Sequence, residues 1–134
     1  MEVSVAEIPP PLQGAELEVL KALWEHGPGT VRAVNDTLRG QGRSWAYTTV
    51  QTMLHRLEAK GYVRCEKGKP AHVYAPALSR EEVLSRRLRD LADRLCDGVA
   101  SPLVQALVEG GRFTSEDVAH LRRLINRLSP PKKR

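Results

Sequence analysis

The chain has 134 residues, enough for one domain with a proper core, or for a small domain and an association element, but too few for two large domains. Its 21 lysine and arginine residues outnumber its 16 acidic residues, and the resulting net charge of +5 favours a polyanionic partner. No run approaches the roughly 18 apolar residues of a membrane span, and the first residues lack the basic and apolar regions of a signal peptide, so we expect neither membrane insertion nor secretion.

Cysteine and histidine residues form no pattern typical of a metal site or a disulfide framework. Cys65 and Cys96 lie far apart and outside any CxxC motif. The four histidines are scattered as His26, His55, His72 and His120. We therefore expect no metal, no cofactor and a location in the reducing cytoplasm. The chain also lacks a nucleophile elbow, a P-loop, a GxGxxG motif and an HExxH motif, so we expect no catalytic residues and no enzyme activity.

In chain order, residues 1–12 end in three prolines, whose fixed φ angles and missing N–H groups prevent a helix, so we expect a flexible arm. Apolar residues at helical spacing predict a first helix over 15–26. A second, shorter helix is predicted to begin after Thr30, whose hydroxyl can cap it, and to end at Gly40. Residues 43–45 are then predicted to form a short extended segment.

The stretch 47–60 predicts an amphipathic helix that ends in a left-handed cap at Gly61. Its apolar positions gather on one side, at Val50, Met53, Leu54 and Leu57. Over 47–57 the opposite side carries no apolar residue, and its hydroxyl, imidazole, guanidinium and amide groups can address phosphate oxygens and base edges in a major groove. An ordinary solvated helix face is the alternative for such a polar stripe. The predicted DNA-reading residues are Tyr47, Thr48, Thr49, Gln51, Thr52, His55 and Arg56.

A β-hairpin is predicted directly after this helix. Residues 62–67 alternate in polarity with period two, 68–70 can form a turn, and 71–75 can return as the partner strand. Helix, helix, short strand, helix and hairpin is the order of a winged helix, in which the third helix enters the DNA groove. Basic groups on the wing and its flanks suit DNA phosphates, although a Lys-Gly-Lys tip could also serve only to blunt a sheet edge. The predicted backbone contacts are Arg43, Lys60, Lys67, Lys69 and His72.

Residues 17–74, and above all the stretch 45–61, resemble the winged-helix segment of the penicillinase and methicillin-resistance repressors, on whose plan copper-operon repressors are also built. The positions at the family's spacing are Trp45, Thr49, Gln51, Thr52, Leu54, Arg56, Leu57 and Gly61. The resemblance continues to a helix start at 114–117. It implies a homodimeric transcriptional repressor that addresses its operator with the helix over 47–60 and touches the DNA backbone with the wing.

The last third of the chain predicts three amphipathic helices. A capping box at 79–82 begins the first helix, Ser101 begins the second and Thr114 begins the third. These helices could pack on the first domain of the same subunit. Three short helices alone form only a small core, however, and a dimer would bury the apolar surface that remains. A dimer would also place two reading helices on the two halves of an inverted repeat. The predicted dimerisation residues are Leu84, Leu88, Leu91, Leu95, Leu103, Leu107, Leu121, Leu124, Ile125 and Leu128.

The sequence thus predicts a mainly α protein with a small β-hairpin. We expect a flexible arm over 1–12, a winged helix-turn-helix DNA-binding domain over 13–77, a three-helix dimerisation domain over 78–129 and a basic tail over 130–134. The predicted function is a homodimeric DNA-binding repressor of an inverted-repeat operator. The alternative is a winged-helix module that binds an acidic protein, which would favour apolar residues on the outer face of the third helix rather than the polar residues found there.

Two departures from the family's pattern concern regulation. In the β-lactam-responsive members, a membrane sensor protease cuts an Asn-Phe bond in the middle helix of the dimer element. The resemblance therefore implies such a protease as a partner, but the matching region 104–108 has no Asn-Phe pair, so we do not expect cleavage there. The copper-responsive members carry paired cysteines near the carboxyl end. This chain has none after Cys96, so we do not expect copper sensing by that route.

Overall fold

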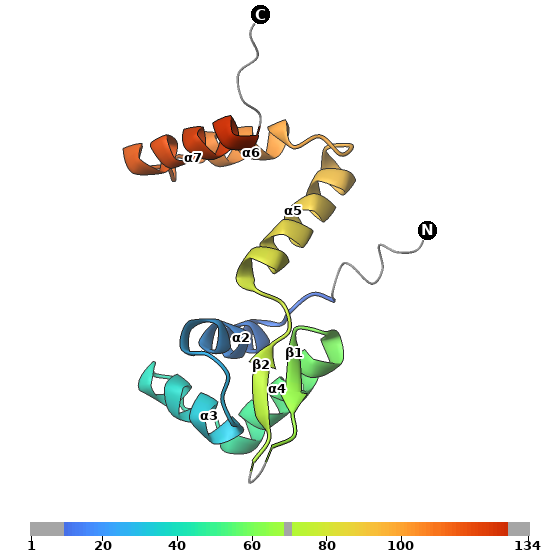
Figure 1. Cartoon of the computed structure of the whole chain (residues 1–134), viewed down its shortest axis with the longest axis vertical. Coiled ribbons are helices and arrows are strands. Elements are labelled where there is room, and N and C mark those ends of the chain that lie inside the picture. The colour runs from blue at the N-terminus through green and yellow to red at the C-terminus, as the bar shows by residue number, and fades with distance from the viewer. Residues whose placement is uncertain (1–9, 69–70, 129–134) are drawn as a thin grey trace, which may run out of the picture. The chain divides into compact units, whose positions relative to one another are not determined.

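The computed structural model describes residues 10–68 and 71–128, in which helices and strands follow one another as shown in Figure 1. The elements are α2 (Gly14–His26), α3 (Val31–Gly40), α4 (Tyr47–Lys60), β1 (Val63–Glu66), β2 (Val73–Pro76), α5 (Arg80–Leu95), α6 (Ser101–Glu109) and α7 (Ser115–Leu128). This order confirms the predicted mainly α fold with a small hairpin. The chain forms two compact units, Met1–Asp90 and Leu91–Arg134. Residues 1–9 of the predicted arm and the predicted basic tail, 130–134, lie outside the described residues.

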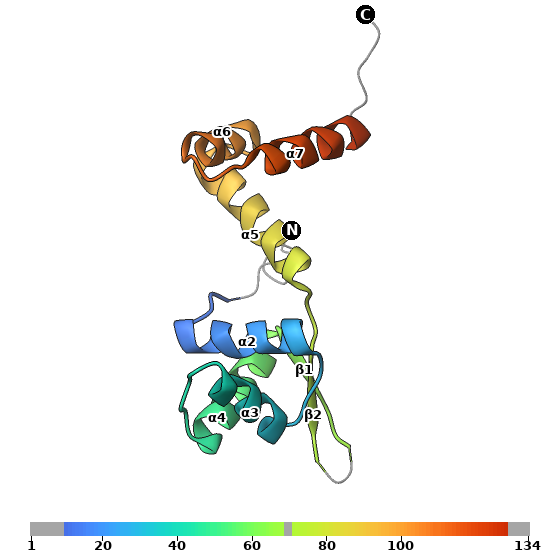
Figure 2. The same ribbon diagram turned by 90° about the vertical axis from the view of Figure 1, so that its left-hand side faces the viewer.

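Three helices, α2, α3 and α4, enclose the core of the first unit, and the hairpin lies beside them (Figure 2). In each helix the apolar residues recur at helical spacing, so one side of each helix faces inward. Burying one large apolar side chain stabilises the fold by roughly 1.5–3 kcal/mol relative to leaving it exposed, which fixes the rotation of each helix. The residues with no exposed area are Val19, Leu20, Leu38, Val50, Leu54, Leu57 and Tyr62.

Caps begin and end these helices where the sequence predicts them. The Thr30 hydroxyl accepts the Ala33 backbone N–H at 3.1 Å and so caps α3. Gly61 ends α4 with a φ of 91°, in the left-handed region that favours glycine. Before α5, the Ser79 hydroxyl accepts the Glu82 N–H at 3.0 Å, and the Glu82 carboxylate accepts the Ser79 N–H at 2.8 Å. The predicted capping box is therefore confirmed.

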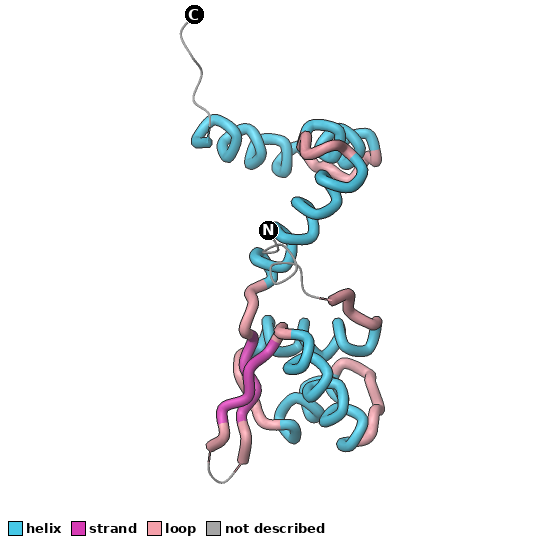
Figure 3. The backbone as a smooth tube through the Cα atoms, turned by 90° about the vertical axis from the view of Figure 1, so that its right-hand side faces the viewer, coloured by secondary structure: helices cyan, strands magenta, loops and turns pink. Residues whose placement is uncertain are grey.

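The two strands β1 and β2 lie side by side, drawn in magenta in Figure 3. They pair in antiparallel register, with Cys65 opposite Tyr74. The predicted extended segment, 43–45, forms no strand, because the N–H of residue 43 donates back to α3. Instead, Gly29 pairs with Tyr74 through two hydrogen bonds of 3.0 and 2.8 Å. A Cβ atom on Gly29 would lie 3.3 Å from the Ala33 Cβ, so this close approach favours glycine.

Lys60, which the sequence predicts to contact the DNA backbone, is the counterion of a buried carboxylate. Its Nζ lies 2.6 Å from Glu16 Oε1 and donates to the Pro11 carbonyl at 3.0 Å. The Glu16 side chain is 1% exposed, and a carboxylate buried to this extent requires a cation nearby. Lys60 follows the buried Leu57 by three residues, which puts it near the inner side of α4. The Lys60 ammonium is therefore already paired within the fold.

The environment of Glu16 changes its protonation. Burial by itself raises the pKa of the Glu16 carboxyl. The hydrogen bond that this carboxylate accepts from the Gln13 backbone N–H, 3.0 Å long, and the Lys60 ammonium act in the opposite direction. Together they outweigh burial and hold the pKa of Glu16 below its ordinary value of 4.5. The folded chain therefore favours the ionised carboxylate.

The helices after the winged helix leave many large apolar side chains exposed. Ala92 is the buried residue of α5, and no described residue of α6 or α7 is buried. Leu103, Leu121 and Leu124 are half-buried. No helix in the described ranges is both long enough and apolar enough to cross a bilayer. The exposed apolar residues of these three helices include Leu84, Leu88, Leu91, Leu95, Val104, Leu107, Val108, Val118, Ile125 and Leu128.

A pH series should reveal the contribution of Glu16 to stability. A carboxyl whose pKa is lower in the folded chain stabilises the fold above its ordinary pKa, and this contribution is lost as pH falls through the folded-state value. We expect Glu16→Gln to lower the free energy of unfolding by roughly 1–3 kcal/mol at pH 7. The difference from the parent should shrink as the pH falls below 4.5. Urea unfolding at several pH values measures this. Glu58→Gln, on the exposed side of α4, is the control, and a gap that stayed constant down to acid pH would contradict the assignment.

Candidate nucleic-acid interface

The outer face of α4 is polar and open to solvent. The four inward residues named in the sequence prediction are buried, and Thr48, Thr52, His55 and Arg56 on the other side are exposed. Tyr47 at the start of the helix is also exposed, and Thr49 and Gln51 at the margins are half-buried. The predicted division of this helix into a core side and an outer side is therefore confirmed. The outer side offers groups that can hydrogen-bond base edges and phosphates.

Beside this face lies a hollow of about 610 Å³, formed by the start of α3, the outer side of α4 and the second half of the hairpin. None of the described residues that line it is acidic. Its polar lining consists of Thr30, Arg32, Tyr47, Gln51, His55 and His72. Because the amino end of a helix carries partial positive charge and free N–H groups, the start of α3 adds to this lining. The hollow is chemically suited to an anion such as a DNA phosphate.

Arg32 is absent from the set predicted from the sequence. It lies two residues after the Thr30 cap, in the first turn of α3, and its side chain is exposed. An arginine next to a helix start is a local signal for anion binding that could have identified it. The residues predicted from the sequence lie on α4, on the wing and on their flanks, whereas Arg32 lies on α3, which the fold places beside α4 and the hairpin.

Tyr74 contributes to one wall of the hollow and keeps its hydroxyl neutral. Its side chain is almost fully buried, and its ring centroid lies 6.3 Å from that of His55. Burial, with further contributions from neighbours that include Cys65, raises the pKa of Tyr74 to about 12. The phenol therefore remains protonated at physiological pH, and it adds no negative charge to a site suited to anions.

The predicted backbone-contacting residues differ in how free they are. Lys67 and His72 are exposed on the two sides of the hairpin turn, and Lys69 lies outside the described residues. Arg43 already has partners within the fold, because its guanidinium lies 3.5 Å from the Glu18 carboxylate and 5.8 Å from the centre of the Trp45 ring. Its side chain is nevertheless 47% exposed, so the guanidinium can still reach an anion in solvent. Lys60 differs from these residues, because its ammonium is paired with the buried Glu16 carboxylate.

No group of three or more histidine, cysteine, aspartate or glutamate residues within the described ranges is arranged to hold a metal ion. Cys65 and Cys96 are both free thiols. The chemistry that the interface offers is hydrogen bonding and charge.

Comparison with known proteins identifies the family. Residues 12–127 match the family model described as penicillinase repressor. The penicillinase repressor of Bacillus licheniformis is 27% identical over 124 residues, which cover 92% of this chain and 96% of that protein. The transcriptional regulator BlaI of Mycobacterium tuberculosis is 35% identical over 115 residues, which cover 84% of this chain and 81% of that protein.

Among solved structures, the monomeric form of Bacillus licheniformis BlaI in complex with the blaP half-operator is similar to this chain. The match has 34% sequence identity and a TM-score of 0.46, and it covers 55% of this chain and 88% of that chain. The family consists of transcriptional repressors rather than enzymes. Because the family model spans most of the sequence, this chain belongs to the penicillinase repressor family and is a DNA-binding transcriptional repressor.

Proposed function

We propose that this repressor acts as a homodimer that recognises an inverted-repeat operator through α4 and a basic wing. The observation that carries the proposal is the outer face of α4, where Thr48, Thr52, His55 and Arg56 are exposed while the inner face is sealed in the core. A helix that docks on a protein would be expected to expose apolar or aromatic residues instead. Polar side chains of this kind suit the donor and acceptor pattern of a major groove.

Within this interface, we assign two roles. Thr48, Thr52, His55 and Arg56 address base edges, because they lie on the side of α4 that faces away from the core. The residues that bind phosphates and set the register of the protein on DNA lie on the flanks. They are Arg32, Arg43, Tyr47, Lys67 and His72, with Thr49 and Gln51 at the margin between the two roles. We assign the phosphate-binding role to Lys69 as well, from its position in the sequence alone.

We assign DNA binding to residues 13–77 and association to residues 78–129. Support comes from the apolar side chains that α5, α6 and α7 leave in solvent. Exposed apolar surface on several consecutive helices is characteristic of an interaction surface. A second copy of the chain is the partner that fits, because a dimer with two-fold symmetry presents two identical reading helices to the two halves of an inverted repeat.

Selection of DNA from a random pool by the purified full-length protein tests the proposal directly. We expect the selected sequences to contain two related half-sites in inverted orientation, their centres one or two helical turns apart, which is roughly 34 Å or 68 Å. Selection of single half-sites would argue against the dimer. If no sequence were enriched at about 150 mM salt, DNA reading by this face would be refuted, and an acidic protein partner would become the better explanation.

Arg56→Ala and Thr52→Ala should weaken binding to the selected operator while the protein remains folded and associated. Both side chains lie on the exposed side of α4, so truncation removes DNA contacts but no core packing. Loss of one good base contact is worth about 1–3 kcal/mol, or roughly 5- to 150-fold in affinity. Gel-shift titration measures the loss, and Glu58→Ala on the same helix is the control. Parent-like affinity in both variants would refute the assignment of this face.

Leu91→Asp should separate the proposed dimer into monomers. The substitution places a charge among the apolar residues of α5, where an unpaired buried charge is strongly unfavourable. Sedimentation should then show monomers, and affinity for the complete operator should fall by roughly 100-fold or more, because simultaneous engagement of two half-sites is lost. Arg89→Asp, at an exposed polar position of the same helix, should remain associated. A Leu91→Asp protein that sediments as a tight dimer would contradict the proposed surface.

A further inference from the structure

The segment Pro10–Gln13 connects two helices with different roles in the proposed function. The Pro10 carbonyl accepts the Tyr62 hydroxyl at 2.6 Å and the Arg87 guanidinium at 2.9 Å. The Arg87 guanidinium also donates to the Tyr62 hydroxyl oxygen. One backbone carbonyl thus joins α5, through Arg87, to the residue that follows the cap of α4. We call this segment and its contacts the strap.

The strap is also fixed to the end of the reading helix. The Pro11 carbonyl accepts the Lys60 ammonium at 3.0 Å, and Lys60 is the last residue of α4. The same ammonium is paired with Glu16, whose carboxylate accepts the Gln13 N–H at the end of the strap. The two bonds of Lys60 join residues more than forty positions apart in the sequence. The bond from Gln13 to Glu16 is local and caps the start of α2. The strap therefore has a buried ionic anchor on the α4 side.

Tyr62 is well suited to hold the α5 side. It has no exposed area, so its ring cannot move away without opening the core. Burial raises the pKa of Tyr62 even against the effect of the Arg87 guanidinium, so the hydroxyl keeps the proton that it donates to Pro10. Because the group is buried, a lost hydrogen bond cannot be replaced freely by water.

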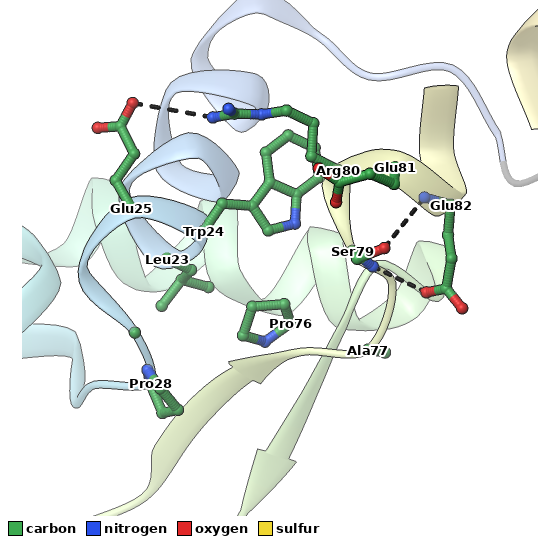
Figure 4. Close-up of a pocket in the computed structure, with 11 residues that line it drawn as sticks. Leu23, Trp24, Glu25, Pro28, Pro76, Ala77, Ser79, Arg80, Glu81 and Glu82 are labelled. Atoms are coloured by element: carbon green, nitrogen blue, oxygen red, sulfur yellow. Dashed lines mark hydrogen bonds and ion pairs between the residues drawn. The ribbon is translucent and has the colours of Figure 1, made fainter. Parts of the chain in front are cut away.

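A second tether holds α5 at its first residue. The Arg80 guanidinium lies 5.3 Å from the centre of the Trp24 ring and 3.8 Å from the Glu25 carboxylate, as Figure 4 shows. The Trp24 indole N–H in turn donates to the Leu78 carbonyl at 2.9 Å, just before the helix starts. Arg80 and Arg87 are separated by seven residues, or about 10 Å at 1.5 Å per residue. One tether would let α5 pivot, whereas two tethers separated by about two turns fix its direction.

We propose that the strap fixes the direction in which α5 leaves the winged helix, and that Tyr62 and Arg87 are therefore positioning residues for operator binding. The inference rests on the proposed homodimer, in which α5 carries part of the association surface. The direction of α5 then determines the separation of the two reading helices. Neither residue lies on the outer face of α4, so neither is needed for contact with a single half-site.

The experiment compares binding of the full-length protein to a complete operator and to one half-site. Tyr62→Phe removes only the hydroxyl, and Arg87→Gln replaces the charged guanidinium with a shorter, neutral amide. We expect both variants to bind the half-site within about twofold of the parent and to lose roughly tenfold in affinity for the complete operator, which is the effect of about one hydrogen bond. Arg87→Lys, which can still donate to the Pro10 carbonyl, should recover most of the loss. Arg89→Gln removes an exposed arginine of the same helix and should behave like the parent.

Hydrogen exchange supplies a readout that does not depend on DNA. In Tyr62→Phe and Arg87→Gln, amides of residues 80–90 should exchange faster than in the parent, and those in the middle of α4 should not. An unchanged ratio of complete-operator to half-site affinity would overturn the proposal. An equal loss on both DNAs would also overturn it, because the residues would then support the winged helix in general. If the parent selected no inverted repeat, the proposed function would fail, and unchanged exchange over 80–90 would separately refute the strap.

Discussion

The packing of α4 against α2 and α3 is the constraint on which the other features of this repressor depend. Val50, Leu54 and Leu57 have no exposed area. Exposing any one of these side chains to water would cost roughly 1.5–3 kcal/mol of folding free energy. Rotation of the helix about its axis by one residue would expose part of this set and bury Thr52 or Arg56 without partners. The same burial that stabilises the domain therefore determines which side chains of α4 face solvent.

The local pattern of the sequence was sufficient to predict which side of each helix is buried and where the helices end. It was not sufficient to predict contacts between residues far apart in the sequence. Helical spacing and the cap at Gly61 depend only on neighbouring residues, so both could be predicted. The pairs of Glu16 with Lys60 and of Gly29 with Tyr74 join residues more than forty positions apart, and only tertiary packing brings them together. The pairing of Lys60 with Glu16 was missed for this reason, although the position of Lys60 three residues after Leu57 indicated the inner side of α4.

Net positive charge alone is a poor guide to the DNA-facing surface of this chain. Lys60 neutralises the buried Glu16, Arg80 is shared between Trp24 and Glu25, and Arg87 serves a carbonyl and a phenol. All three cations help to hold the first unit together, and Lys60, whose side chain is 22% exposed, has little charge to offer to a phosphate. The cations available for DNA are those that the fold leaves exposed around the hollow, whose described lining has no acidic residue. Arg32 at the start of α3 is one of them.

In the proposed homodimer, the exposed apolar helices would connect association to operator affinity. In the described part of α6 and α7 no residue is buried, so these helices gain little from folding within one chain. If a second copy covers them, the stability of the second unit depends on protein concentration by mass action. Binding to both halves of an operator would then fall more steeply on dilution than binding to one half-site, because dilution removes the dimer as well as the complex. A repressor built in this way can be released by any change that weakens the helical surface, without alteration of a single DNA-reading residue.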